Sequence, residues 1–164
     1  FFMGDERYVK EDSKNSNINL IKKYLLNNIK ISSKKIFKIP TNTNSINKDA
    51  KNYQKIIKKY FQNKKICFDI VLLGIGNDGH IASLFKKNIS KKKQNLVDYV
   101  KKKNFNRITL TLSCINKSNS IFLWAPGKRK ARIVQKILLD KKFKYPASYL
   151  KKNNNFLFYS DWLC

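Results

Sequence analysis

The stretch VLLGIGNDGHIASLF, from Val71 to Phe85, decides the fold of this chain of 164 residues. At its start, residues 68–73 are apolar apart from Asp69, as expected for a strand that is covered on both faces in a parallel sheet. The turn that follows contains three glycines, which allow the backbone to bend tightly and to approach a ligand closely. Because open α/β sheets bind ligands at the carboxyl ends of their strands, we expect this turn to form the functional site.

Two side chains of this turn can carry chemistry. Asp78 and His80 are two residues apart, and His80 is the only histidine of the chain. A histidine with an ordinary pKa of about 6.5 accepts and releases a proton near neutral pH. The alternative is a structural turn with a capping aspartate and an incidental histidine. The spacing of Gly74, Gly76 and Gly79 also resembles a dinucleotide fingerprint, but Asp78 would repel a pyrophosphate and no acidic residue ends a strand about 20 residues later.

Strands and helices alternate on both sides of this stretch. Ser16 or Asn17 is predicted to cap a helix with Ile18, Ile21, Leu25 and Ile29 on its apolar face. Apolar spacing predicts further helices over 50–61 and 128–139. The predicted strands cover 1–3, 35–40, 68–73, 107–113, 120–125 and 155–162, and Trp124 and Trp162 are expected in the core. This order predicts a single α/β domain over 1–164 with a mostly parallel sheet.

The net charge of +26 favours anionic partners in general. Almost all of this charge comes from lysines that are spread through the chain among asparagines, whereas base-reading sites and bidentate phosphate sites rely on arginine. We therefore expect a solvated basic surface and no specific nucleic-acid binding, with a basic nucleic-acid-binding module as the alternative. An anionic substrate would still be attracted by the field.

The cysteines and the apolar runs indicate the compartment. Cys67, Cys114 and Cys164 are widely spaced, which favours unpaired thiols in a reducing compartment rather than a metal or redox site. No apolar run is long enough to cross a membrane, and we expect no targeting segment at the start. The prediction is a cytoplasmic protein without a metal or cofactor.

Four ordered stretches together resemble the 6-phosphogluconolactonases, in the family shared with glucosamine-6-phosphate isomerases. LLGIGNDGHIASLF is similar to their Gly-x-Gly-x-Asp-Gly-His-x-x-Ser-Leu-Phe signature. The other three are GDERYV with Ser16-Asn17, RITLTLSCIN and APGKRKA, similar respectively to the family's Asp-Glu-Arg loop, its Leu-Thr-Leu strand and its Gly-x-x-Lys-Ala turn. The resemblance implies a Rossmann-like α/β fold with helices on both faces of the sheet. It also implies hydrolysis of 6-phosphoglucono-lactone in the oxidative pentose phosphate pathway.

The chain departs from the family pattern at three places. Lys86 and Ser113 stand where a proline is usual. The family's first strands and its phosphate-holding glycine turn would precede Phe1. We therefore expect either a fragment, with those first strands missing, or an incomplete phosphate site. A piece of a fusion with glucose-6-phosphate dehydrogenase would fit this expectation.

The resemblance also implies roles for individual residues. Lactone hydrolysis needs a base for water, donors for the oxyanion and an acid for the ring oxygen. His80 would act as the base and then protonate the ring oxygen, while Asp78 would orient His80 or shape the loop. Gly76, Asn77 and Gly79 are candidate substrate-binding positions of the same turn.

Outside this turn, the implied site residues are charged. Arg7, beside Asp5, would contact the phosphate or stabilise the tetrahedral intermediate; the alternative is a surface ion pair of little energetic value. Lys130, in the first turn of the helix predicted over 128–139, would bind the phosphate, because helix N-termini favour anions. Arg107, at the start of a strand, is a further phosphate candidate.

Other functions remain open at this point. A glucosamine-6-phosphate deaminase would follow the histidine with an Ile-Ala-Phe-Asn-Glu type of string, whereas Ile81–Phe85 lacks that glutamate. An inactive regulatory remnant is a further alternative.

Overall fold

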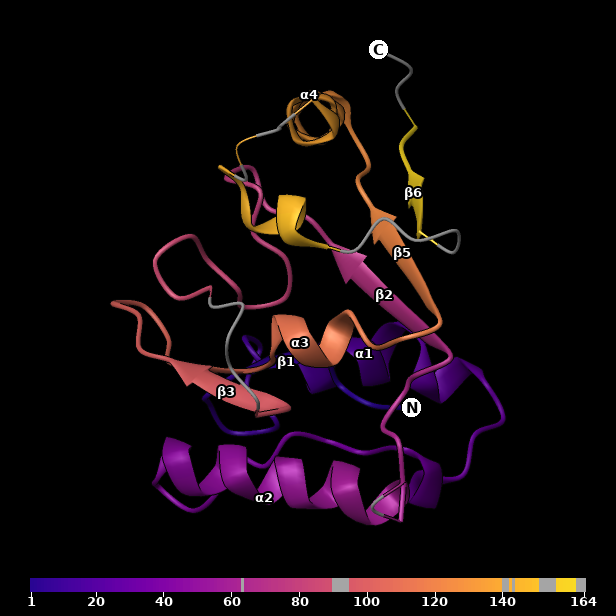
Figure 1. The fold of residues 1–164 in the computed structure, drawn as a ribbon. Coiled ribbons are helices and arrows are strands. Elements are labelled where there is room, and N and C mark those ends of the chain that lie inside the picture. Colours follow the sequence, from indigo (N-terminus) through magenta and orange to yellow (C-terminus); the bar gives the residue numbers. More distant parts are fainter. Residues whose placement is uncertain (63, 90–94, 140–141, 143, 151–155, 162–164) are drawn as a thin grey trace. The chain divides into compact units, whose positions relative to one another are not determined.

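The computed structural model describes residues 1–62, 64–89, 95–139, 142, 144–150 and 156–161 (Figure 1). Internal contacts divide the chain into two compact units. The first unit comprises Phe1–Lys65 and Leu96–Leu110, and the second unit comprises Ile66–Asn95 and Thr111–Cys164. No helix of the described segments has the length and apolar composition that a membrane span requires.

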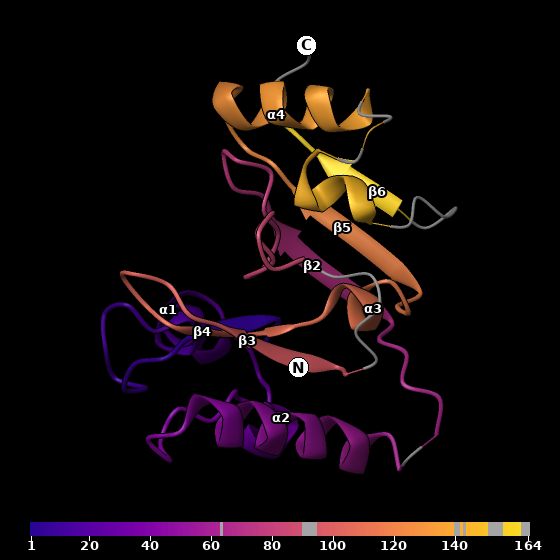
Figure 2. The same ribbon diagram turned by 60° about the vertical axis from the view of Figure 1, so that its left-hand side comes forward.

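The first unit contains a three-stranded antiparallel sheet in the order β1 (Asp5–Arg7), β4 (Arg107–Leu110) and β3 (Val97–Val100). Its helices are α1 (Asn17–Tyr24) and α2 (Ile46–Tyr60), with short 3₁₀ helices η1 (Leu26–Asn28) and η2 (Ser33–Lys35) between them. Helix α2 packs along β3 and β4 (Figure 2). It forms as its sequence predicts, since Ala50, Tyr53 and Ile57 recur at helical spacing and are all buried.

A buried carboxylate joins α1 to β1. Glu6, in the middle of β1, is 2% exposed. It accepts hydrogen bonds from the backbone N–H groups of Arg7 (2.8 Å), Asn17 (2.6 Å) and Ile18 (2.8 Å), and from the Ser16 hydroxyl (3.2 Å). Burial raises the pKa of Glu6, although these hydrogen bonds oppose the shift. The first N–H groups of a helix lack partners within the helix, so Glu6 satisfies the start of α1 and fixes it against the strand.

The second unit contains a parallel sheet in the order β2 (Ile70–Gly74), β5 (Ser120–Trp124) and β6 (Phe156–Tyr159). Helices α3 (Leu112–Ile115) and α4 (Lys128–Leu138) and the 3₁₀ helix η3 (Pro146–Tyr149) complete this unit. Side chains alternate across the sheet. Those of one face are buried, among them Val71, Leu73, Ile121 and Leu123, whereas Leu72 on the other face is 74% exposed.

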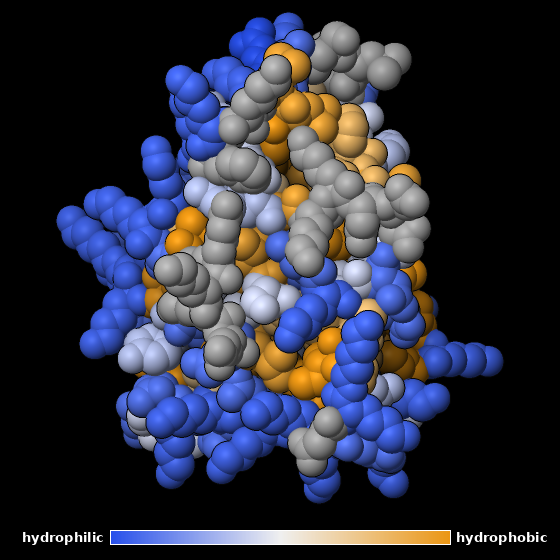
Figure 3. Space-filling view, in the orientation of Figure 1, coloured by the Kyte–Doolittle hydropathy of each residue, from blue (hydrophilic) through white to orange (hydrophobic). Residues whose placement is uncertain are grey.

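The structure confirms the α/β class and the parallel pairing of the strand that precedes the glycine-rich turn. It adds the antiparallel sheet of the first unit, whose strand β3 the sequence did not predict. Its four residues include Asp98, which interrupts the apolar pattern. Hydrophilic side chains project from much of the molecular face in Figure 3, with hydrophobic surface between them, as the lysine-rich composition predicts.

Several details of the sequence prediction are wrong. Helix α1 ends at Tyr24, so Leu25 and Ile29 lie beyond it and are 43% and 46% exposed. Trp124 is not a core residue; it is 55% exposed and stacks on Tyr159 with ring centroids 4.3 Å apart. Trp162 lies outside the described residues.

Several predicted strands are shorter than expected. The strand predicted over 107–113 ends at Leu110, because the Thr111 hydroxyl accepts the Cys114 N–H at 3.2 Å and caps α3 instead. The strands predicted over 1–3 and 35–40 reduce to one bridge between Phe2 and Phe37.

Candidate active site

The glycine-rich turn follows β2 directly and closes on itself. The Gly76 N–H donates to the His80 carbonyl, and the Gly79 N–H donates to the Gly76 carbonyl, both at 2.9 Å. Gly79 has a φ of +77°, a left-handed conformation that favours glycine, and a Cβ there would lie 2.9 Å from the Tyr145 Cβ. The Gly79 carbonyl accepts the Ala147 N–H at 2.9 Å, which ties the turn to η3.

Within this turn, Asp78 and His80 form a hydrogen-bonded pair. The Nδ1 atom of His80 lies 2.5 Å from Oδ1 of Asp78, and the backbone N–H of His80 donates to the same oxygen at 3.2 Å. An ionised carboxylate can only accept hydrogen bonds, so Nδ1 carries the hydrogen and Nε2 keeps a lone pair. The side chain of His80 is 31% exposed. The turn therefore presents an oriented, solvent-accessible base.

The Asp78 carboxyl is ionised at neutral pH. Burial acts to raise its pKa, but hydrogen bonds from the His80 ring and backbone, together with the His80 charge, outweigh burial and lower the pKa of Asp78 below 3.8. At neutral pH the Asp78 carboxylate is therefore a hydrogen-bond acceptor for the His80 ring.

Gly76 provides the space that the imidazole occupies. A Cβ at Gly76 would lie 2.1 Å from both Cε1 and Nδ1 of His80, and 2.9 Å from Oδ1 of Asp78. No side chain can share that space with the ring in its observed position. The glycine is thus required for the pairing of His80 with Asp78 and not only for the bend of the chain.

Lys130 follows the neighbouring strand at the same edge of the sheet. Gly74 at the end of β2 pairs with Trp124 at the end of β5, and these strands are parallel. Helix α4 begins shortly after β5, and its first three residues are Lys128, Arg129 and Lys130. Gly127, which precedes the helix, has a φ of +87°. The Gly127 N–H donates to Oδ1 of Asp161 at 2.5 Å. As predicted, Lys130 lies in the first turn of a helix.

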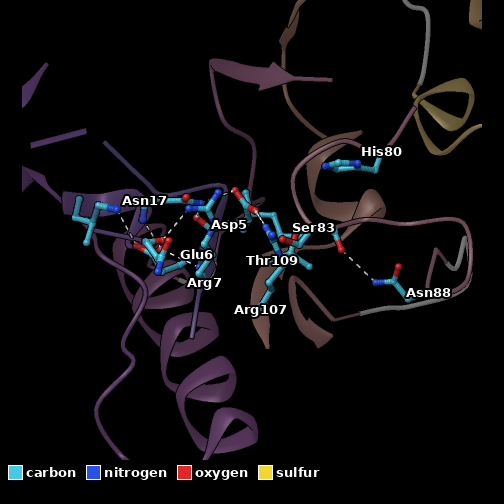
Figure 4. Close-up of polar contacts among 12 residues, drawn as sticks. Asp5, Glu6, Arg7, Asn17, His80, Ser83, Asn88, Arg107 and Thr109 are labelled. Atoms are coloured by element: carbon cyan, nitrogen blue, oxygen red, sulfur yellow. Dashed lines mark hydrogen bonds and ion pairs between the residues drawn. The ribbon is translucent and has the colours of Figure 1, made fainter. Parts of the chain in front are cut away.

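Asp5, Arg7 and Arg107 lie together in the first unit (Figure 4). Strand register places Arg7 opposite Arg107, and a guanidinium nitrogen of Arg107 lies 4.0 Å from Oδ2 of Asp5. Burial lowers the pKa of Arg107, and the Asp5 charge opposes that shift. The Asn17 amide donates to the Asp5 carbonyl at 3.2 Å and to its carboxylate at 3.3 Å. Arg7 donates to the Asn15 carbonyl at 3.0 Å, and its Nε is buried without a hydrogen-bond partner among the described residues.

Sequence reasoning missed four residues that shape these groups. Glu6 and Asn17 organise the charges of the first unit, Phe85 packs against the His80 ring, and Asn88 accepts the Phe85 N–H. The Asp-Glu-Arg string was the only signal for Glu6, and nothing local indicated that its partners start a helix ten residues later. In the described part of the chain, no cluster of three His, Cys, Asp or Glu side chains could hold a metal ion.

The fold and the turn define a class. The second unit is an α/β unit whose parallel strands end in an oriented histidine and in a basic helix N-terminus, which is typical of enzymes that act on anionic metabolites. The chain belongs to the family described as glucosamine-6-phosphate isomerases/6-phosphogluconolactonase, which matches residues 1–159. This confirms the family predicted from the four sequence motifs.

Individual proteins that are similar to this chain point to the same family. The chain is 29% identical to a 6-phosphogluconolactonase of Synechocystis over 98% of its own length and 69% of the relative. It is 34% identical to that of Thermotoga maritima over 85% of its length and 62% of the relative. Among solved structures, a Thermotoga maritima 6-phosphogluconolactonase matches with a TM-score of 0.84 at 30% identity, covering 98% of this chain and 71% of the other. The Trypanosoma brucei enzyme matches with a TM-score of 0.78 at 29% identity, covering 98% and 70%.

The space at Gly76 gives a testable prediction. In Gly76→Ala the methyl group should push the half-exposed imidazole off Asp78, which removes the hydrogen bonds and the charge that lower the pKa of Asp78. That pKa should rise towards its ordinary value of 3.8. A carboxyl with a lowered pKa stabilises the fold above its unfolded-state pKa, and this contribution is lost as pH falls through the lowered value, so the variant should lack this acid-sensitive contribution.

Carbon NMR titration of Asp78 measures this pKa directly. Gly74→Ala is the matched control, because a Cβ at Gly74 would meet nothing within 4 Å. The steric account is wrong if Gly76→Ala keeps the wild-type Asp78 titration.

Proposed function

We propose that this chain hydrolyses 6-phosphoglucono-lactone to 6-phosphogluconate, a step of the oxidative pentose phosphate pathway. One observation carries the proposal: Nδ1 of His80 lies 2.5 Å from Oδ1 of Asp78, at the carboxyl edge of a parallel sheet. Because an ionised carboxylate only accepts hydrogen bonds, we infer that Nδ1 carries the hydrogen and that Nε2 of the neutral ring can accept a proton. The names of the relatives that this chain resembles, several of them 6-phosphogluconolactonases, support the same reaction.

The proposed reaction uses water as the nucleophile. Nε2 of His80 takes a proton from water while the water oxygen bonds to the lactone carbonyl carbon, which produces a tetrahedral intermediate and an imidazolium. When the intermediate collapses, the bond from that carbon to the ring oxygen breaks, and the imidazolium returns its proton to the ring oxygen. Asp78 remains ionised throughout and stabilises the imidazolium. A lactone is already an activated ester, so the reaction requires no covalent enzyme intermediate.

For the phosphate of the substrate, we propose Lys130 as a ligand. The first turn of α4 combines a lysine ammonium with the partial positive charge of a helix N-terminus, and the net charge of +26 attracts an anion to the protein. Arg7 and Arg107 stay predicted anion ligands in the first unit. Gly76, Asn77 and Gly79 stay predicted contacts of the substrate.

The setting of the enzyme is also a proposal. Cys67 and Cys114 are free thiols, as expected in a reducing compartment, and we propose a cytoplasmic location. Oxidation of glucose 6-phosphate at its anomeric carbon would supply this lactone. Fusion to, or association with, glucose-6-phosphate dehydrogenase stays a prediction.

His80→Asn should reduce kcat by about 10²–10⁴-fold, because the chain has no second histidine to supply a base near neutral pH. The assay follows acid release from 6-phosphoglucono-lactone above the spontaneous rate, with glucosamine 6-phosphate tested in parallel for deamination. A His80→Asn protein with the wild-type unfolding midpoint and near wild-type turnover would overturn the assignment. Deamination by the wild type without lactone hydrolysis would favour the deaminase instead.

Lys130→Ala should raise KM for 6-phosphoglucono-lactone more than it lowers kcat. The phosphate is remote from the carbonyl, so the ground state and the transition state share its binding energy. Losing a charge-assisted contact of roughly 1.5–3 kcal/mol corresponds to an increase in KM of about 10–100-fold.

The KM for unphosphorylated gluconolactone should be unaffected by Lys130→Ala. Lys136→Ala, at the exposed far end of α4, removes the same charge and controls for the general field. Equal weakening of both substrates by Lys130→Ala would exclude Lys130 as the phosphate ligand.

A further inference from the structure

The segment after His80 contains a residue in a strained conformation. Ala82 has a φ of +46°, in the left-handed region that costs a non-glycine residue roughly 1–2 kcal/mol. On either side, Ile81 and Leu84 are buried, and the Leu84 N–H donates to the Ile81 carbonyl at 2.9 Å. Such a conformation persists only where the surrounding contacts hold it in place. Residues in strained conformations cluster at functional sites.

The side chain of Asn88 holds the end of this segment. Its Oδ1 accepts the Phe85 N–H at 2.7 Å. Its Nδ2 donates to the Ser83 carbonyl at 3.2 Å (Figure 4). The backbone N–H groups of Asn88 and Ile89 donate to the Phe85 carbonyl at 3.0 and 2.9 Å. Both backbone polar groups of Phe85 therefore take part in hydrogen bonds of this turn, and the Asn88 side chain accepts from its N–H.

Phe85 in turn packs against the catalytic imidazole. The ring centroids of His80 and Phe85 are 4.6 Å apart, with an angle of 38° between the planes. The imidazole is thus restrained at Nδ1 by Asp78 and on its ring by Phe85. A ring held at two places loses the rotations that would turn Nε2 away from a bound substrate.

We propose that Asn88 is a positioning residue for His80: its side-chain amide fixes the turn at 83–88 and so keeps the Phe85 ring against the imidazole. The proposal rests on the proposed role of His80 as the base. Phe85 to Asn88 form a turn closed by the Asn88 N–H, and its second position, which is Lys86 here, is where proline would rigidify such a turn. The Asn88 side chain supplies this restraint in a chain that has lysine there.

The single histidine makes the test direct, because its imidazole C–H protons give signals that belong to no other residue. In Phe85→Leu these signals should lose the ring-current shift of the phenyl group, which gives a reference. In Asn88→Ala they should move most of the way towards that reference. Lys87→Ala, an exposed neighbour in the same turn, is the matched control and should match the wild type.

Activity gives the second readout. Asn88→Ala should lower kcat for the lactone about tenfold with little change in KM, because a small misplacement of a reacting group affects the transition state most. Lys86→Pro added to Asn88→Ala should recover both the imidazole shifts and kcat, and it is the test variant if Asn88→Ala alone does not fold.

Wild-type imidazole shifts in a folded Asn88→Ala, or a double variant whose shifts match the Phe85→Leu reference, would overturn the proposal. The NMR arm stands apart from the proposed function. Absence of lactone hydrolysis in the wild type would refute the lactonase, while the imidazole shifts would still decide whether Asn88 positions His80.

Discussion

The hydrogen bond from Nδ1 of His80 to Asp78 is the interaction on which the candidate active site depends. It selects the tautomer with a free Nε2, and it holds the ring over a backbone position where any Cβ would collide with it. The glycines of the turn therefore have different tasks. Gly79 supplies a left-handed conformation, and Gly76 supplies empty space. A general base must be both oriented and unprotonated. The turn orients His80 through its contacts with Asp78 and Phe85, which lie within ten residues of each other in the chain.

A second carboxylate organises the first unit in a comparable way. Glu6 is buried and ionisable, and it is tolerated because four donors from the start of α1 and from β1 surround it. The position of α1 in turn places Asn17 on Asp5, which lies beside Arg107. Glu6 therefore acts on the predicted site residue Asp5 indirectly, through the position of α1 and its residue Asn17. Removing Glu6 would leave buried N–H groups without acceptors, so its importance is structural before it is chemical.

The sequence predicted the features whose cause is local. Strand β2, helices α2 and α4 and the glycine-rich turn follow from apolar spacing and from glycine chemistry within about 15 residues. The sequence did not predict the hydrogen-bond partners of Glu6, nor the hydrogen bond between the Asn88 side chain and the Phe85 N–H. Those contacts depend on how the folded chain brings separate residues together, which apolar spacing does not show. The exposure of Trp124 was missed for a related reason: an apolar strand pattern shows that a side chain lies on a face of a sheet but not what covers that face.

The most direct test of this account is the tautomer of His80 in the wild-type protein. Nitrogen NMR of the lone imidazole distinguishes a protonated ring nitrogen from one with a free lone pair, and no other histidine overlaps the signals. Above the pH at which the ring loses its second proton, the account predicts hydrogen on Nδ1, bonded to Asp78, and a free lone pair on Nε2. A neutral ring with its hydrogen mainly on Nε2 would contradict the account, because the lone pair would then lie on Nδ1, facing Asp78, and Nε2 could not accept a proton from water.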